Sequence, residues 1–190
     1  MARICVSAVL ALLLCLPLGG LAEAADAPFS LAEGLTWASA PGEAAAWLGE
    51  GAEFQEDMDE DLGKMGLVTR DDLTFAGLPC GRAAIIYYND AMVFATFYFT
   101  AESVGGDMEG LVQAMRATLG EPEYVEDGAE MDDELPEEIE SVRVHCRWAP
   151  DADTKVSVLE ITEPDYPYLC SLFFENVPVS EALEIAMEVE

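Results

Sequence analysis

Hydrophobic positions follow a helical period most clearly between residues 107 and 121. The apolar residues of this segment share one helical face: Met108, Leu111, Val112, Met115 and Leu119. Asp107 can cap the amides of the first turn, Gly120 suits a left-handed position after the last turn, and Pro122 blocks continuation. The pattern therefore predicts a helix over this segment.

A weaker copy of the pattern covers residues 39–50. Ser39 is its predicted N-cap, and Pro41 lies in the first turn, where a missing amide costs nothing. Its apolar face consists of Ala44, Trp47 and Leu48. Both segments end in Leu-Gly-Glu and lead into strand-like segments, so we interpret them as copies of an internal repeat. Coincidence is the alternative, because Leu-Gly-Glu is a common helix ending.

Strand-like patterns follow both predicted helices. They cover residues 73–75, 82–88 and 91–99 after the first helix, and 141–148, 155–161 and 168–174 after the second. The composition of residues 180–190 favours a helix, although its apolar residues alternate as in a strand. We therefore predict a two-layer α+β fold in which a helix and three antiparallel strands are repeated, with a possible C-terminal helix. The two halves of this αβββ-αβββ arrangement are about residues 29–102 and 103–178.

The segments 82–88 and 91–99 form a predicted hairpin with two apolar faces. Asn89 and Asp90 tolerate positive φ, and a two-residue turn there pairs Tyr87 with Met92, Ile86 with Val93 and Ile85 with Phe94. One face then carries Ala84, Ile86, Val93, Ala95, Phe97 and Phe99, and the other carries Ile85, Tyr87, Met92, Phe94 and Tyr98.

If the helices cover one face of the sheet, the face with Ile85 and Tyr87 needs another cover. Large exposed apolar patches usually mark interfaces, in which Tyr is common. We therefore predict that Ile85, Tyr87, Met92, Phe94 and Tyr98 bind another protein. A constitutive cover by the second half, by the tail or by a second copy in a homodimer is the alternative.

A second candidate binding feature is the alternating segment 141–148. Val142, Val144, Cys146 and Trp148 fall on one predicted face, and Arg143, His145 and Arg147 on the other. These three nitrogen-bearing side chains suit an anionic group of a partner, with His145 able to respond to pH. Internal pairing with neighbouring acidic residues is the alternative.

The first residues have the pattern of a secretory signal peptide. Arg3 supplies a positive start, an apolar stretch runs over residues 4–18, and Ala22-Glu23-Ala24 fits the cleavage rule. We predict a signal peptide over residues 1–25 and one domain over residues 26–190, exported to a periplasmic or extracellular location. Lipidation at Cys15 is the minor alternative, because Leu14 is bulky where a small residue is preferred. No second apolar segment is long enough to span a membrane.

The formal net charge of -30 narrows the range of partners. Phosphate contacts need clustered Lys and Arg, so a nucleic-acid partner is excluded. Divalent cations, a basic partner or a salty habitat would each relieve the self-repulsion. Cys80, Cys146 and Cys170 remain after export, and they allow one disulfide with one leftover thiol, in any of three pairings. Cys146 and Cys170 lie in apolar strand patterns, so both could equally be unpaired core residues.

Acidic residues gather in two segments. In the first, 50–61, the residues Asp57, Asp59 and Asp61 alternate as in a calcium loop, but Leu62 and Val68 occupy positions where Gly and Glu are expected. The second, 121–140, contains no Lys or Arg and is predicted to be a mobile loop. A solvated surface is the alternative to calcium binding, which is the one cofactor the sequence suggests.

The sequence offers little to support catalysis. It contains one His, and it lacks a nucleophile-elbow Ser, a paired-cysteine motif and a phosphate-binding Gly loop. Carboxylate pairs are uninformative in so acidic a chain. We therefore expect a protein that is not an enzyme.

The two helix endings also resemble a known group of small exported bacterial modules. The residues that carry this resemblance are Leu35-Thr36-Trp37 to Leu48-Gly49-Glu50, and Leu119-Gly120-Glu121-Pro122. They are similar to the helix and exit that precede a meandering sheet in BamE-like and beta-lactamase-inhibitor-like modules, although Ala44 to Ala46 replace the usual Val. The resemblance implies a non-catalytic protein binder or assembly factor and no particular partner.

Overall fold

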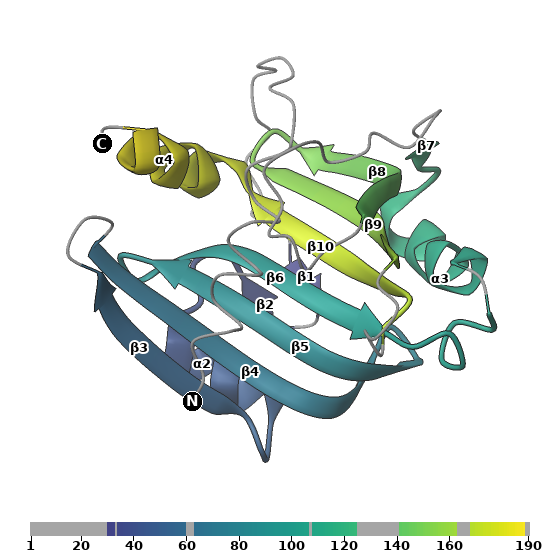
Figure 1. Cartoon of the computed structure of the whole chain (residues 1–190), viewed down its shortest axis with the longest axis horizontal. Coiled ribbons are helices and arrows are strands. Elements are labelled where there is room, and N and C mark those ends of the chain that lie inside the picture. Colours follow the sequence, from purple (N-terminus) through teal and green to yellow (C-terminus); the bar gives the residue numbers. More distant parts are fainter. Residues whose placement is uncertain are drawn as a thin grey trace.

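The computed structural model describes residues 30–32, 34–59, 63–106, 108–124, 141–162 and 168–188. Within them one antiparallel sheet has the strand order β3-β4-β5-β6-β10-β9-β8-β7 (Figure 1). Its strands are β3 (Glu53–Asp59), β4 (Gly63–Phe75), β5 (Leu78–Tyr88), β6 (Ala91–Phe99), β7 (Glu123–Tyr124), β8 (Ser141–Asp151), β9 (Thr154–Thr162) and β10 (Cys170–Asn176). A small hairpin of β1 (Ser30–Ala32) and β2 (Leu35–Thr36) precedes it, and the helices are α2 (Pro41–Leu48), α3 (Glu109–Leu119) and α4 (Val177–Glu188).

The predicted αβββ-αβββ fold is wrong, because the described residues form a β-rich fold in which eight strands share one antiparallel sheet and three helices pack with it. In the part of the chain that the structure describes, four strands, not three, follow each of α2 and α3. The strands that the prediction missed are β3 and β7, both in segments that we interpreted as acidic loops. Acidic residues are depleted in strands in general, but they are tolerated on edge strands, where charge prevents pairing with other chains.

Helices α2 and α3 end close to their predicted positions. The segment 107–121 is confirmed as a helix, although α3 begins at Glu109 and Asp107 lies outside the described residues. Gly49 and Gly120, which follow α2 and α3, have φ values of 88° and 80°. Such positive φ is cheap for glycine, which explains why both helices stop there.

The N-terminus of α2 differs from its prediction. Ala40 is the N-cap, and the carboxylate of Glu43 accepts a hydrogen bond from the Ala40 amide at 2.8 Å. Ser39 instead accepts a hydrogen bond on its hydroxyl from the Thr36 amide at 3.1 Å. At the other end of the chain, the helical interpretation of the tail is confirmed by α4.

The hairpin of β5 and β6 forms at the predicted turn, where Asn89 and Asp90 have φ values of 49° and 66°. Tyr87 pairs with Met92 as predicted, but a bulge follows, so that Ile86 pairs with Phe94. Because Val93 is an extra residue in β6, the side chains that follow it point to the opposite face of the sheet from the one predicted. The predicted division of this hairpin into two faces is therefore wrong beyond the bulge, because a bulge adds one residue to one strand.

Helices cover both faces of the sheet. One core cluster joins α2 and α3 to the sheet, and it includes Leu48, Val112, Ile85, Phe97 and Phe174. Within it the rings of Phe75 and Phe97 stack with centroids 3.8 Å apart. A second cluster on the opposite face contains Leu183 of α4, the helix that continues directly from β10 (Figure 1). No helix among the described residues is long and apolar enough to cross a membrane.

Candidate functional site

The apolar residues predicted to bind a partner are buried in the structure. The exposed fractions are 0% for Ile85, 1% for Tyr87, 0% for Met92, 2% for Phe94 and 7% for Tyr98. They also fall into separate clusters, because the bulge at Val93 divides them between the two faces. Ile85, Tyr87 and Met92 pack with α2 and α3, whereas Phe94 stacks on Phe173 at a centroid distance of 5.3 Å and Tyr98 contacts Tyr168. They do not form an exposed patch.

The predicted stripe of Arg143, His145 and Arg147 is also divided. The register of β8 shifts between Val144 and Cys146, so Val144 faces the α4 side of the sheet while Cys146 faces the α2 and α3 side. Arg143 lies opposite Glu160, and Arg147 lies opposite Ser157. Since side chains alternate along a strand, these registers place the two arginines on opposite faces. The prediction of one basic face is therefore wrong, because a bulge is invisible in the alternating pattern.

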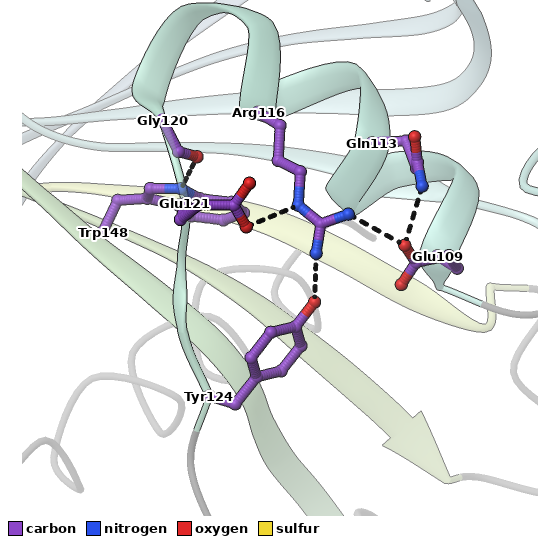
Figure 2. A network of polar contacts seen from close by, with 7 residues as sticks. All are labelled: Glu109, Gln113, Arg116, Gly120, Glu121, Tyr124 and Trp148. Atoms are coloured by element: carbon purple, nitrogen blue, oxygen red, sulfur yellow. Dashed lines mark hydrogen bonds and ion pairs between the residues drawn. The ribbon is translucent and has the colours of Figure 1, made fainter.

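His145 lies beside a polar network that joins α3 to β7 and β8. Its ring makes an edge contact with Tyr124 at a centroid distance of 5.7 Å. Arg116 is the centre of the network: it lies 3.2 Å from Glu109 and 3.1 Å from Glu121, and it donates a hydrogen bond to the Tyr124 hydroxyl at 2.8 Å (Figure 2).

Two further hydrogen bonds complete this network. The indole N–H of Trp148 donates to the Gly120 carbonyl oxygen at 3.0 Å, and the Gln113 amide donates to Glu109 at 3.0 Å (Figure 2). The bond from Trp148 to Gly120 and the bond from Arg116 to Tyr124 hold the exit of α3 against the edge of the sheet. Because carboxylates of the chain itself already surround the Arg116 guanidinium, this cluster is a structural joint and not an open site for an anion.

Other basic residues are paired within the chain in the same way. Lys64 lies 2.9 Å from Glu56 and 2.8 Å from Asp90, and these partners raise its pKa, with Asp90 contributing most. Arg82 lies 3.7 Å from Asp71, and Lys155 lies 3.8 Å from the buried Glu175. In a chain of net charge -30, each such pair relieves local repulsion.

The residues suggested as calcium ligands lie in different surroundings from those expected. Asp57 and Asp59 belong to the extended strand β3, not to a loop, and Asp61 lies outside the described residues. In the described part of the chain, His, Cys, Asp and Glu side chains nowhere gather in threes that could hold a metal ion. Calcium binding stays a prediction of the sequence.

The three cysteines within the described ranges are unpaired core residues. Cys80, Cys146 and Cys170 all belong to the cluster beneath α2 and α3. Burial raises the pKa of Cys80 and of Cys146 to about 11, and that of Cys170 to about 12. These thiols therefore stay protonated at neutral pH, which leaves them unsuited to act as nucleophiles.

The most accessible binding feature is the edge strand β3. Phe54 and Met58 are 45% and 68% exposed, and they are two of the four large apolar side chains that are exposed in the described part of the chain. Among the described residues, β3 pairs with β4 on one side and with no strand on the other. This surface is concealed in the sequence because acidic residues surround Phe54 and Met58. The available signal was the even spacing of Phe54 and Met58, which puts both on one face of a strand.

Comparisons with protein-family models, with curated proteins and with solved structures found no match to this chain. The resemblance to BamE-like and beta-lactamase-inhibitor-like modules therefore stays a prediction.

Proposed function

We propose that this chain is an exported, acidic, non-enzymatic module that binds another protein, and that it does so at the edge of its sheet. The proposal is carried by the exposure of Phe54 and Met58 on the edge strand β3. The faces of the sheet are less suitable, since Tyr87 and Phe94 are used by the core. Export is supported by the signal-peptide pattern of residues 1–25 in the sequence.

Edge strands expose unpaired backbone amides and carbonyl groups, which makes them ready templates for another chain. Charged side chains are one means by which proteins protect such edges, and β3 carries four acidic residues, Glu53, Glu56, Asp57 and Asp59. Protection by charge does not require large apolar side chains. The combination of charge with exposed Phe54 and Met58 instead favours an interface whose partner is selected by its own charge.

Photo-crosslinking in the cells that produce the protein tests this function. A photoreactive amino acid replaces Met58 on β3 in one variant and Ile185 on α4 in the control, since Ile185 is comparably exposed at 63%. We expect a discrete protein adduct from position 58 and none from position 185. Equal adducts from both positions, or none from position 58, would reject binding at this edge. Mass spectrometry of the purified mature chain tests the cleavage near residue 25.

A further inference from the structure

The register of β3 with β4 shows to which face of the sheet each β3 side chain points. Phe54 lies opposite Val68, and Glu56 lies opposite Gly66. Since Val68 belongs to the core beneath α2, residues 54, 56 and 58 face the α2 side. Gln55 and Asp57 lie opposite Leu67 and Met65, so they face the other side together with Glu53. One side of the edge is therefore mainly apolar and the other mainly acidic.

The Phe54 ring packs beside the edge of the sheet in space left by a glycine of the neighbouring strand. A Cβ atom on Gly66 would lie 3.3 Å from the Phe54 ring, so this ring rests directly over the β4 backbone. The ring packs against β4 at this glycine, yet it remains 45% exposed. A strand added beyond β3 would place a side chain against the free edge of this ring.

The acidic side of β3 retains carboxylates that no basic side chain in the described part of the chain neutralises, although Asp57 accepts a hydrogen bond from the Met58 amide at 2.9 Å. Glu56 on the apolar side is paired with Lys64 at 2.9 Å. Across the described ranges, Lys and Arg form no ion pair with Glu53 or Asp57. An added strand with Lys or Arg at alternate positions would meet these carboxylates, whereas one with Asp or Glu would be repelled.

The same charges argue against a second copy of this chain as the occupant. Four of the seven residues of β3 are acidic and none is basic. Pairing two such strands would bring carboxylates of one copy beside those of the other, which is destabilising.

From these observations we infer that β3 adds to its sheet an extended segment of a partner in which basic and apolar residues alternate. This inference rests on the proposed function and specifies the chemistry of its partner. The apolar residues of the segment lie against Phe54 and Met58, and the basic residues lie over Glu53 and Asp57. Backbone hydrogen bonds along the edge supply affinity, and the alternating side chains supply selectivity.

Fluorescence anisotropy of labelled peptides with the full mature chain tests the inference. The probe is a peptide of alternating Lys and Val, and its controls have the same composition with the lysines gathered at one end, or Glu in place of Lys. A further peptide carries N-methyl groups on alternate backbone amides. We expect the alternating peptide to bind at least about tenfold more tightly than each control, which corresponds to about 1.4 kcal/mol.

Variants of the chain locate the binding site of the peptide. Phe54→Ser combined with Met58→Ser should weaken binding about tenfold, while Ile185→Ser leaves it unchanged, and thermal melts should show that all variants are folded. Equal binding of the segregated or N-methylated peptide would overturn strand addition, because general attraction to an acidic surface needs neither alternation nor amides. A dimer of the free protein that dissociates in the Phe54→Ser, Met58→Ser variant would also overturn it, since a second copy would then occupy the edge.

The two proposals fail in different ways. A discrete adduct at position 58 in cells, combined with no preference among the peptides, would reject strand addition and retain protein binding at the edge. A preference for the alternating peptide combined with no adduct in cells would reject the proposed function, because the edge would then have no natural occupant.

Discussion

The indole N–H of Trp37 donates a hydrogen bond of 2.9 Å to the hydroxyl oxygen of Thr154, a residue 117 positions later in the chain. Trp37 lies between the small β1–β2 hairpin and α2, whereas Thr154 begins β9 in the second half of the sheet. Thr154 is 1% exposed, so its hydroxyl is shielded from water. This contact fixes the segment before α2 to strands that are distant in sequence.

Replacing Trp37 with Phe should destabilise the fold, because the buried Thr154 hydroxyl loses its donor. We expect a loss of about 1 kcal/mol in the free energy of unfolding. Denaturant titration of Trp37→Phe, Thr154→Val and the double variant measures the coupling between the two residues. Losses that simply add in the double variant would show that this hydrogen bond contributes nothing.

Tyr87 and Phe94 were predicted from the sequence to lie on a binding surface, but both are buried. Truncating either side chain should therefore lower the free energy of unfolding. Tyr87→Ala and Phe94→Ala each remove a ring that is almost fully buried, and we expect each to cost about 3–5 kcal/mol. The matched control is Phe54→Ala, which should cost less, about 1 kcal/mol, because its ring packs on β4 with 45% of its surface still exposed. Chemical denaturation measures all three, and a small loss for Tyr87→Ala and Phe94→Ala would contradict the burial described above.

Two glycines at the same position of their helices should respond to alanine in opposite ways. Gly42 follows the first residue of α2 and has open space around a Cβ atom, so Gly42→Ala should stabilise the protein by about 0.5–1 kcal/mol. Gly110 follows the first residue of α3, where a Cβ atom would lie 2.7 Å from the carbonyl oxygen of Val104. Gly110→Ala should therefore destabilise it. Thermal unfolding compares the two variants, and a rise in Tm for both would refute the close approach at Gly110.

The buried thiols should make the fold sensitive to alkaline pH. Burial raises the pKa of Cys80 and Cys146 to about 11 from an ordinary value of 9.0. Below pH 9 the folded and unfolded chains both keep these protons, so the thiols do not change stability with pH. Between about pH 9 and 11 the unfolded chain loses them first, and the free energy of unfolding falls.

Each thiol contributes at most about 1.4 kcal/mol per pH unit to this fall. Urea titrations at increasing pH measure the slope, and Cys146→Ala should make it shallower than in the parent chain. The native protein should also fail to react with a thiol reagent at pH 8 until it is unfolded. Rapid labelling of the native chain would contradict the burial of the cysteines.

Local sequence patterns predicted the elements that are determined by residues close together in the chain. The helix around Leu111 and Met115 was recognised because its apolar positions recur at the helical period and Gly120 ends it. The turn at Asn89-Asp90 was recognised because few residue types tolerate positive φ. In each case the residues that decide the structure lie within a few positions of one another.

The candidate site could not be predicted in the same way. The acidic composition of β3 conceals a strand that forms because β4 supplies hydrogen-bond partners. The bulges at Val93 and His145 moved predicted site residues between faces, because register depends on the neighbouring strand and not on the alternation alone. Burial of Tyr87 and Phe94 likewise required the positions of α2 and α4, which no local pattern contains.

The sequence by itself therefore determined the strong charge, the helix of α3, the β5–β6 turn and the apolar strands that build a core. The tertiary structure alone decided that, among the described residues, eight strands share one sheet with β3 at its edge, and that helices cover both of its faces. The physical reason is that hydrophobic period and turn chemistry act over a few residues, whereas edges, registers and burial are set by contacts between segments distant in the chain.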